Sequence, residues 1–400
     1  MVALQVDVVG IGADGWSGLG AEAVRRLLDA EVVFGSGRQL ALLPAAVVAE
    51  RVPWPSPLLP ALPGLLDAHR DRRRCVLASG DPTFHGIGST LVRLLGAERV
   101  RILPQPSSVS LARARLGWPA ADVDVVTLVN APVELLHPVL APGRRLLVLS
   151  ADEHSPDTVA QLLRRRGFGA SELTVLEQLG GPAERQLVGI ADDWPHPPGD
   201  PLNVIAVRCL GTGALSRVPG LPDEQYDSDG QLTKREVRAV TLSRLAPLPG
   251  QLLWDVGAGS GSIAIEWSRT HPSCRAIAVE PDPQRCERIS ANAAALGVPG
   301  VRVVRGRAPG ALAGLPAPDT VFVGGGATVP GVVETCWDAL GPGGRLVLNA
   351  VTIETEQVLA DWYARLGGEL SRLSVSRAAP VGGFTGWRTM MPVTQLEVIK

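Results

Sequence analysis

The chain has 400 residues, 46% hydrophobic and 20% charged, which is typical of a folded protein of about two domains and excludes a largely disordered one. Its net charge of −2 gives no general attraction to polyphosphate, so we expect no nucleic acid partner. It contains no signal-peptide pattern, no run of about 18 apolar residues and no CxxC pair, so we expect a cytoplasmic protein without membrane contact, disulfide framework or metal site.

The first half of the chain alternates short apolar runs with helical stretches such as 21–30 and 89–95. The predicted strands are Val6–Val9, Val32–Phe34, Cys75–Ala78, Val100–Leu103, Val125–Leu128 and Leu146–Leu149. This alternation predicts a largely parallel sheet. A second lobe, richer in strands, is predicted from Leu173–Leu176, Arg185–Gly189 and Asn203–Val207. We therefore expect a bilobal α/β domain.

The first predicted strand runs into Gly10–Gly15, a literal match to the G-x-G-x-x-G pattern of dinucleotide sites. The next strand, however, ends in Gly35 and Ser36, with no acidic residue to hold a ribose. Dinucleotide binding is therefore disfavoured. A dinucleotide-dependent reductase still remains as the alternative function.

Two further loops rich in Gly, Ser and Asp follow apolar strands, at 79–86 and at 104–110. Because the loops at the carboxyl ends of parallel strands converge on one crevice, we expect these two and Gly10–Gly15 to outline a ligand site.

The segment 210–230 is rich in Gly, Pro and Asp and has no periodicity, so we expect domains at 1–210 and 231–400 joined by a linker at 211–230. The strands predicted in the second half are Gln251–Asp255, Arg275–Glu280, Val301–Arg305, Thr320–Val323 and Arg345–Asn349. With helices between them they indicate a Rossmann-like, doubly wound sheet. Two final strands, Glu369–Val375 and Thr394–Ile399, are expected to close it in antiparallel fashion.

The first strand of this half runs into a second glycine loop, Asp255–Gly261. Such a loop lets a ligand approach the backbone and aims helix N-terminal amides at a negative group, here a carboxylate. Glu280 ends the next strand, where it can accept both hydroxyls of a ribose. The tight G-x-G-x-G spacing favours S-adenosylmethionine over a dinucleotide, and Asp255 is expected to fix the loop.

The acceptor of the methyl group is not expected to be an exocyclic amine, because no Asn-Pro-Pro-aromatic segment follows the fourth strand, which runs instead into Gly324–Gly326. No Ser/His/Asp set is apparent, and His271 is interpreted as a structural residue.

The first-half loops resemble the signature loops of the tetrapyrrole (corrin/porphyrin) methylase family, as does the later segment 176–185. This resemblance implies that the methyl donor contacts Gly80, Asp81, Pro82, Ser107 and Ser108. It implies substrate contacts at Gly10, Gly12 and Asp14. One departure is the segment 128–132, where relatives often carry His-Gly-Arg.

The second half resembles the precorrin-6B carbon-15 methyltransferases and decarboxylases through 229–238, the glycine loop, Glu280, 306–309 and 322–325. The implied donor contacts in this class I methyltransferase domain are Thr233, Gly257, Ala258, Gly259, Ser260, Gly261, Glu280 and Ala308. Lys234, Arg235 and Arg238 are candidates for neutralising substrate carboxylates.

Taken whole, the chain resembles the fused precorrin-6Y C(5,15)-methyltransferase (decarboxylating) family of cobalamin biosynthesis. The resemblance implies two S-adenosylmethionine sites, and a tetrapyrrole substrate, precorrin-6B/6Y, that is methylated at carbons 5 and 15. It also implies loss of the ring C acetate carboxylate to give precorrin-8X, and self-association through the second domain. A single-site methyltransferase whose first domain only binds substrate is a further alternative.

Overall fold

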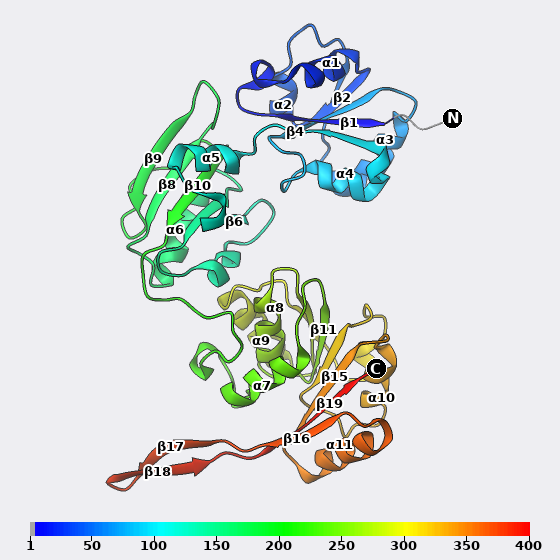
Figure 1. Ribbon diagram of the computed structural model, residues 1–400, viewed down its shortest axis with the longest axis vertical. Helices are drawn as coiled ribbons and strands as arrows, with labels where there is room; N and C mark the ends of the chain where they lie inside the picture. Colours follow the sequence, from blue (N-terminus) through cyan, green and yellow to red (C-terminus); the bar gives the residue numbers. More distant parts are fainter. Residues whose placement is uncertain (1–4) are drawn as a thin grey trace. The chain divides into compact units, whose positions relative to one another are not determined.

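The computed structural model describes residues 5–400 and divides the chain into two compact units (Figure 1). The first unit contains Met1–Val133 and Ala141–Gly213, and the second contains Glu134–Leu140 and Ala214–Lys400. Most of the segment predicted as a linker, from residue 214 on, therefore belongs to the second unit.

Residues 134–140, although they come from the first half of the sequence, pack within the second unit. The ring Nδ1 of His137 is hydrogen-bonded to the carbonyl oxygen of Ala295 at 3.0 Å, and Arg217 Nε donates to the Pro138 carbonyl at 2.9 Å. A Cβ on Gly297 would lie 2.5 Å from Pro138 Cδ, so the packing here is close.

A parallel five-stranded sheet forms one lobe of the first unit, in the order β3-β2-β4-β1-β5. Its strands are β1 (Val6–Ile11), β2 (Val32–Gly35), β3 (Glu50–Pro53), β4 (Arg74–Ser79) and β5 (Val100–Leu103). Its helices are α1 (Ala21–Asp29), α2 (Gly37–Ala41), α3 (Leu58–Ala68) and α4 (Ile87–Leu95). Successive residues of a strand point to opposite faces, so Val9 packs with α1 and α2 while Val8 packs with α3 and α4.

A second five-stranded sheet, in the order β6-β7-β10-β8-β9, gives this unit the expected bilobal build. Its elements are α5 (Ser108–Leu116), β6 (Val123–Thr127), β7 (Arg145–Leu149), α6 (Ser155–Arg165), β8 (Glu172–Glu177), β9 (Arg185–Ile190) and β10 (Asn203–Arg208). Only β6 and β7 pair in parallel. The prediction that these two strands continue the first parallel sheet is wrong, because an apolar run does not say which strand it pairs with.

A seven-stranded sheet, in the order β13-β12-β11-β14-β15-β19-β16, forms the second unit. Its strands are β11 (Leu252–Val256), β12 (Arg275–Glu280), β13 (Arg302–Arg305), β14 (Thr320–Val323), β15 (Arg345–Ala350), β16 (Glu369–Leu373) and β19 (Val393–Ile399). Its helices are α7 (Arg235–Leu245), α8 (Ser262–Thr270), α9 (Pro283–Ala295), α10 (Val332–Ala339) and α11 (Ile353–Leu366). The first five strands are parallel, and β19 is antiparallel to β15 and β16, which confirms the predicted closure.

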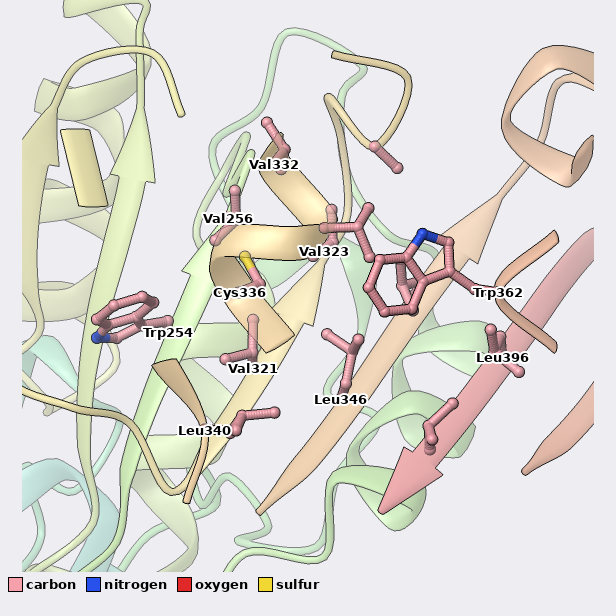
Figure 2. Close-up of a cluster of buried hydrophobic side chains, with 14 of the residues drawn as sticks. Trp254, Val256, Val321, Val323, Val332, Cys336, Leu340, Leu346, Trp362 and Leu396 are labelled. Atoms are coloured by element: carbon pink, nitrogen blue, oxygen red, sulfur yellow. The ribbon is translucent and has the colours of Figure 1, made fainter. Parts of the chain in front are cut away.

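Helices cover both faces of this sheet, and alternate residues of the central strand β11 face each layer. Trp254 and Val256 pack with Cys336 of α10 and Trp362 of α11 (Figure 2). Leu253 faces the opposite layer, which contains α7, α8 and α9. Both faces of the sheet are therefore buried, and a ligand can reach it where the strands end.

A two-stranded hairpin, β17 (Ser376–Val381) and β18 (Phe384–Thr389), projects from the second unit (Figure 1). It pairs with no other strand of the described chain. Near its base, Arg377 contacts Asp223 and Glu236.

Along residues 5–400, no helix combines the length and hydrophobicity needed to cross a bilayer.

Short 3₁₀ helices complete the described elements: η1 (Gly15–Gly18), η2 (Ala97–Arg99), η3 (Ala120–Asp122), η4 (Val133–Val139), η5 (Asp223–Gln225) and η6 (Gly310–Leu312).

Candidate functional site

A cavity of about 720 Å³ lies in the second unit where the parallel strands end. Residues at or just beyond the carboxyl ends of β12, β11, β14 and β15 line it, as does the first residue of the antiparallel β19. The strand order reverses at β11, because β12 lies on one side and β14 on the other. Doubly wound sheets bind ligands at such a reversal, and small-molecule pockets measure about 300–1,000 Å³.

The glycine loop after β11 is closely packed. Gly257, Gly259 and Gly261 all have positive φ, which glycine adopts without strain. A Cβ on Gly257 would lie 2.7 Å from the Gly325 carbonyl oxygen, and one on Gly261 would lie 2.7 Å from Ile289 Cγ2. Both the backbone conformation and the neighbouring atoms therefore require glycine in this turn.

Three amides at the start of this loop are not free for a ligand, contrary to the expectation from the sequence. The N–H groups of Gly257 and Ala258 donate to the Val279 carbonyl at 3.0 and 3.2 Å. The Gly259 N–H donates to Glu280 Oε2 at 2.9 Å. These three amides thus stabilise the protein, and the loop serves a ligand by allowing close approach to its backbone.

Six of the eight donor contacts predicted for this domain line the cavity: Thr233, Gly257, Ala258, Gly259, Glu280 and Ala308. Ser260 and Gly261 do not, because they lie on the side of the turn that packs against α9 and the interior.

Glu280, at the end of β12, is 3% exposed and lines the cavity. Its Oε2 accepts the Gly259 N–H, and its Oε1 accepts the Asp282 N–H at 3.1 Å. Each carboxylate oxygen can accept more than one hydrogen bond. The side chain is therefore held in place and can still accept two hydroxyl groups, as a ribose would require.

Asp255 lies behind the loop, buried at the end of β11. Its Oδ2 accepts the Ala264 N–H of α8 at 3.0 Å, while Oδ1 has no hydrogen-bond partner in the described chain. Burial, with a smaller contribution from the negative charge of Glu280, raises the pKa of Asp255 to about 7 against the lowering effect of the Ala264 N–H. The contact with α8 fixes the start of the glycine loop.

A segment before α7, residues 227–234, covers part of the cavity and contributes Thr233 and Lys234 to its lining. It is attached to α9, because Arg285 Nε donates to Asp229 at 2.8 Å. Hydrogen bonds of 2.9–3.0 Å also join Asp227 to a buried asparagine of α9.

The three basic residues proposed to contact substrate carboxylates differ in their surroundings. Lys234 lines the cavity and forms no ion pair with any residue from 5 to 400. Arg235 is exposed and does not line it. Arg238 is fully buried, so its candidacy as a ligand contact is wrong.

Arg238 is instead part of a buried network that holds the segment before α7. Its Nε donates to Glu266 at 2.6 Å, and its terminal nitrogens donate to the carbonyl oxygens of Thr233 and Leu221. Glu266 also accepts the Tyr226 hydroxyl at 2.8 Å. Sequence reasoning misses this role because the acidic partner lies on another helix.

In the first unit, the loops after β1, β4 and β5 meet as predicted. The Gly80 N–H donates to the Ile11 carbonyl and the Gln105 N–H donates to the Gly80 carbonyl, both at 3.2 Å. A Cβ on Gly10 would lie 1.9 Å from the Gly80 carbonyl oxygen, so this contact requires glycine.

A cavity of about 80 Å³ lies beside this junction, and Gly12, Gly80 and Ser108 line it together with Arg38 and Asn203. The other residues predicted for this site do not line it: Gly10, Asp14, Asp81, Pro82 and Ser107. Its volume is well below the roughly 300 Å³ of a small-molecule pocket. The described conformation therefore does not enclose a ligand as large as the expected methyl donor.

Two polar side chains of these loops stabilise the loops themselves. Asp81 Oδ1 accepts the N–H and the hydroxyl of Thr83 at 2.8 and 2.7 Å. Ser107 caps α5 by accepting the Ser110 N–H at 3.1 Å. At the end of β2, Ser36 caps α2, so this strand end presents no acidic group to a ribose, as the sequence indicates.

Sequence reasoning misses several residues of the larger cavity, among them Asn349, Met390 and Met391. They lie at the end of β15 and just before β19, which return to the same edge of the sheet. Only knowledge of the strand order would have placed them beside the glycine loop.

Comparison with known proteins agrees with this arrangement. Residues 5–193 match the tetrapyrrole (corrin/porphyrin) methylases, and residues 224–400 match the precorrin methyltransferase domain. A protein of Mycobacterium tuberculosis named precorrin-6Y C(5,15)-methyltransferase (decarboxylating) is 51% identical over 399 residues, which cover 99% of this chain and 100% of the relative.

A Sinorhizobium protein of the same name is 48% identical over 398 residues, which cover 99% of this chain and 96% of the relative. A Pyrobaculum aerophilum protein named probable cobalt-precorrin-6B C(15)-methyltransferase (decarboxylating) is 33% identical over 183 residues. This match covers 44% of the present chain and 93% of that relative.

Proposed function

Because the chain belongs to the precorrin-6Y C(5,15)-methyltransferase (decarboxylating) family, and so is a methyltransferase of cobalamin biosynthesis, we propose that it converts precorrin-6B/6Y to precorrin-8X. The first unit methylates carbon 5; the second methylates carbon 15 and decarboxylates the ring C acetate. The observation that carries this proposal is the 720 Å³ cavity, where the glycine loop and Glu280 meet at the strand reversal.

In the second unit, Glu280 and the backbone of Gly257–Gly259 would hold S-adenosylmethionine, with Thr233 and Ala308 beside it. When bound, S-adenosylmethionine supplies an already activated methyl group. The chain then has to align the acceptor carbon with that group and exclude water, which requires no protein nucleophile. The absence of a Ser/His/Asp set from the sequence is compatible with this requirement.

The second donor site lies at the loop junction of the first unit, around Gly80 and Ser108. The 80 Å³ cavity there requires the loops to separate before a donor can enter. Isothermal titration of the full chain should therefore give two equivalents of S-adenosylmethionine, one of which Glu280→Gln should weaken about 10-fold or more. One equivalent in the wild type would favour a first unit that only binds substrate.

Lys234 neutralises a peripheral carboxylate of the substrate, because it is a cation at the cavity with no ion-pair partner among residues 5–400. Lys234→Ala should raise KM for the tetrapyrrole and leave donor affinity unchanged. The exposed Arg235→Ala is the matched control and should change neither. Equal effects of the two substitutions would contradict a specific role for Lys234.

The overall reaction is tested by incubating the full chain with precorrin-6B and donor carrying a labelled methyl group. We expect two labelled methyl groups and one carbon dioxide per product. At donor concentrations below saturation, Glu280→Gln should slow carbon-15 methylation and leave carbon-5 methylation unchanged. Loss of both methyl transfers in this variant would contradict the division of labour between the units.

The chain self-associates through its second unit, where the hairpin β17–β18 offers exposed apolar side chains. Phe384 is 84% and Trp387 80% exposed, and an isolated two-stranded ribbon is at best marginally stable in water. A second copy that covers these side chains would stabilise it. Light scattering of the full chain should find an oligomer. Substitution of both Phe384 and Trp387 by Ser should convert this oligomer to a monomer. A monomeric wild type would refute the proposal.

A further inference from the structure

Asn349 occupies a distinct position in the 720 Å³ cavity. The end of β15 lies on the side of the cavity away from β12 and Glu280. Among the described residues, those that β14, β15, β19 and the segments beside them contribute to the lining are apolar or glycine, with the single exception of Asn349. Val351, Met390 and Val393 are among the apolar residues of this wall.

Buried hydrogen bonds fix the orientation of the Asn349 amide. The Thr241 hydroxyl donates its hydrogen to the Val237 carbonyl at 2.8 Å, so it can only accept from other groups. It accepts from Asn349 Nδ2 at 3.1 Å and from Gln395 Nε2 at 3.0 Å, and Gln395 Nε2 also donates to Asn349 Oδ1 at 2.7 Å. Thr241 and Gln395 are both fully buried.

The network leaves Asn349 one amide hydrogen without a partner in the described chain, on a side chain that lines the cavity. A neutral donor held in an apolar wall can orient an anion without neutralising it. A full ion pair would stabilise a carboxylate that has to become neutral carbon dioxide, and would thus favour the reactant over the transition state.

We propose that Asn349 binds and orients the acetate carboxylate that the substrate loses, an inference that rests on the function proposed above. In that step the bond between the methylene and carboxyl carbons breaks and its electron pair passes into the conjugated ring. Carbon dioxide leaves, and a proton from water converts the methylene to a methyl group. Asn349 contributes position only, and the ring accepts the electrons.

Two substitutions test this role in the full chain with precorrin-6B as substrate. Asn349→Leu removes the donor at similar volume, and we expect kcat/KM for carbon dioxide release to fall about 10- to 150-fold, as for a lost hydrogen bond to a charged group. Asn349→Asp should lower this kcat/KM further near neutral pH, because its carboxylate repels that of the substrate. The kcat/KM of this variant should recover as the pH falls, when a protonated Asp can donate a hydrogen bond again.

Affinity for S-adenosylmethionine, measured by titration calorimetry, should stay within about threefold of the wild type in both variants. Carbon dioxide release at the wild-type rate in Asn349→Leu would overturn the proposal, as would a loss of donor affinity equal to the loss of activity. A purely structural role would give Asn349→Asp no recovery at low pH. A wild-type protein that releases no carbon dioxide from precorrin-6B would refute the proposed function itself.

Discussion

The buried carboxyl group of Asp255 makes the stability of the second unit depend on pH. Its pKa rises from 3.8 to about 7 in the folded protein, which corresponds to about 4 kcal/mol of unfolding free energy. The folded chain keeps this proton up to about pH 7, whereas the unfolded chain releases it near pH 4. The free energy of unfolding should therefore fall as the pH rises from about 4 to 7.

Asp255→Asn keeps an acceptor for the Ala264 N–H but cannot ionise. The variant should match the wild type near pH 4 and exceed its stability by up to about 4 kcal/mol at pH 8. Hydrogen exchange of α8 peptides in the full chain without donor, corrected for the intrinsic pH dependence of exchange, measures the difference. Parallel pH profiles for the two proteins would refute the reasoning.

Three further substitutions probe the same unit. Gly261→Ala should destabilise it by about 2 kcal/mol or more, because the new Cβ meets Ile289 at 2.7 Å and φ is positive; thermal unfolding measures this. Glu280→Gln should weaken binding of S-adenosylmethionine about 10-fold or more in calorimetry, because the Gly259 N–H and the ligand lose a charged acceptor. Arg238→Leu should cost about 3–5 kcal/mol in urea denaturation, because it leaves a buried carboxylate without its cation.

Matched controls separate the causes. Gly250 also has positive φ but open space around its Cβ position, so Gly250→Ala reports backbone strain alone. If Gly250→Ala lowers the free energy of unfolding as much as Gly261→Ala does, the contact between a Cβ at position 261 and Ile289 of α9 does not contribute. The exposed Arg235→Leu should leave stability unchanged, and a loss like that of Arg238→Leu would argue against the buried ion pair.

The central strands of the second unit are predictable because they are buried on both faces and contain continuous apolar runs, such as Ala276–Val279 of β12. The hairpin β17–β18 is not, because most of its residues are exposed and follow no apolar pattern. The edge strand β3 is missed for a related reason: Glu50 and Arg51 interrupt any apolar run.

The same distinction holds for the candidate site. The glycine loop and Glu280 lie on consecutive strand ends, so local spacing is enough to predict that they meet. Asn349 reaches the cavity only through the order in which β14, β15 and β19 pair. The burial of Arg238 depends on Glu266, which lies 28 positions away on another helix, and no local pattern indicates it.

The segment 134–140 has a consequence for synthesis of the chain. His137 leaves the ribosome 158 residues before Ala295, its hydrogen-bond partner in the finished second unit. At about 5–20 residues per second, this interval lasts roughly 8–30 s. The first unit, which includes residues 141–213, can fold during that time. The segment at His137 stays accessible to proteases and chaperones until α9 has been made. Translation speed between these two points therefore bears on the yield of intact protein.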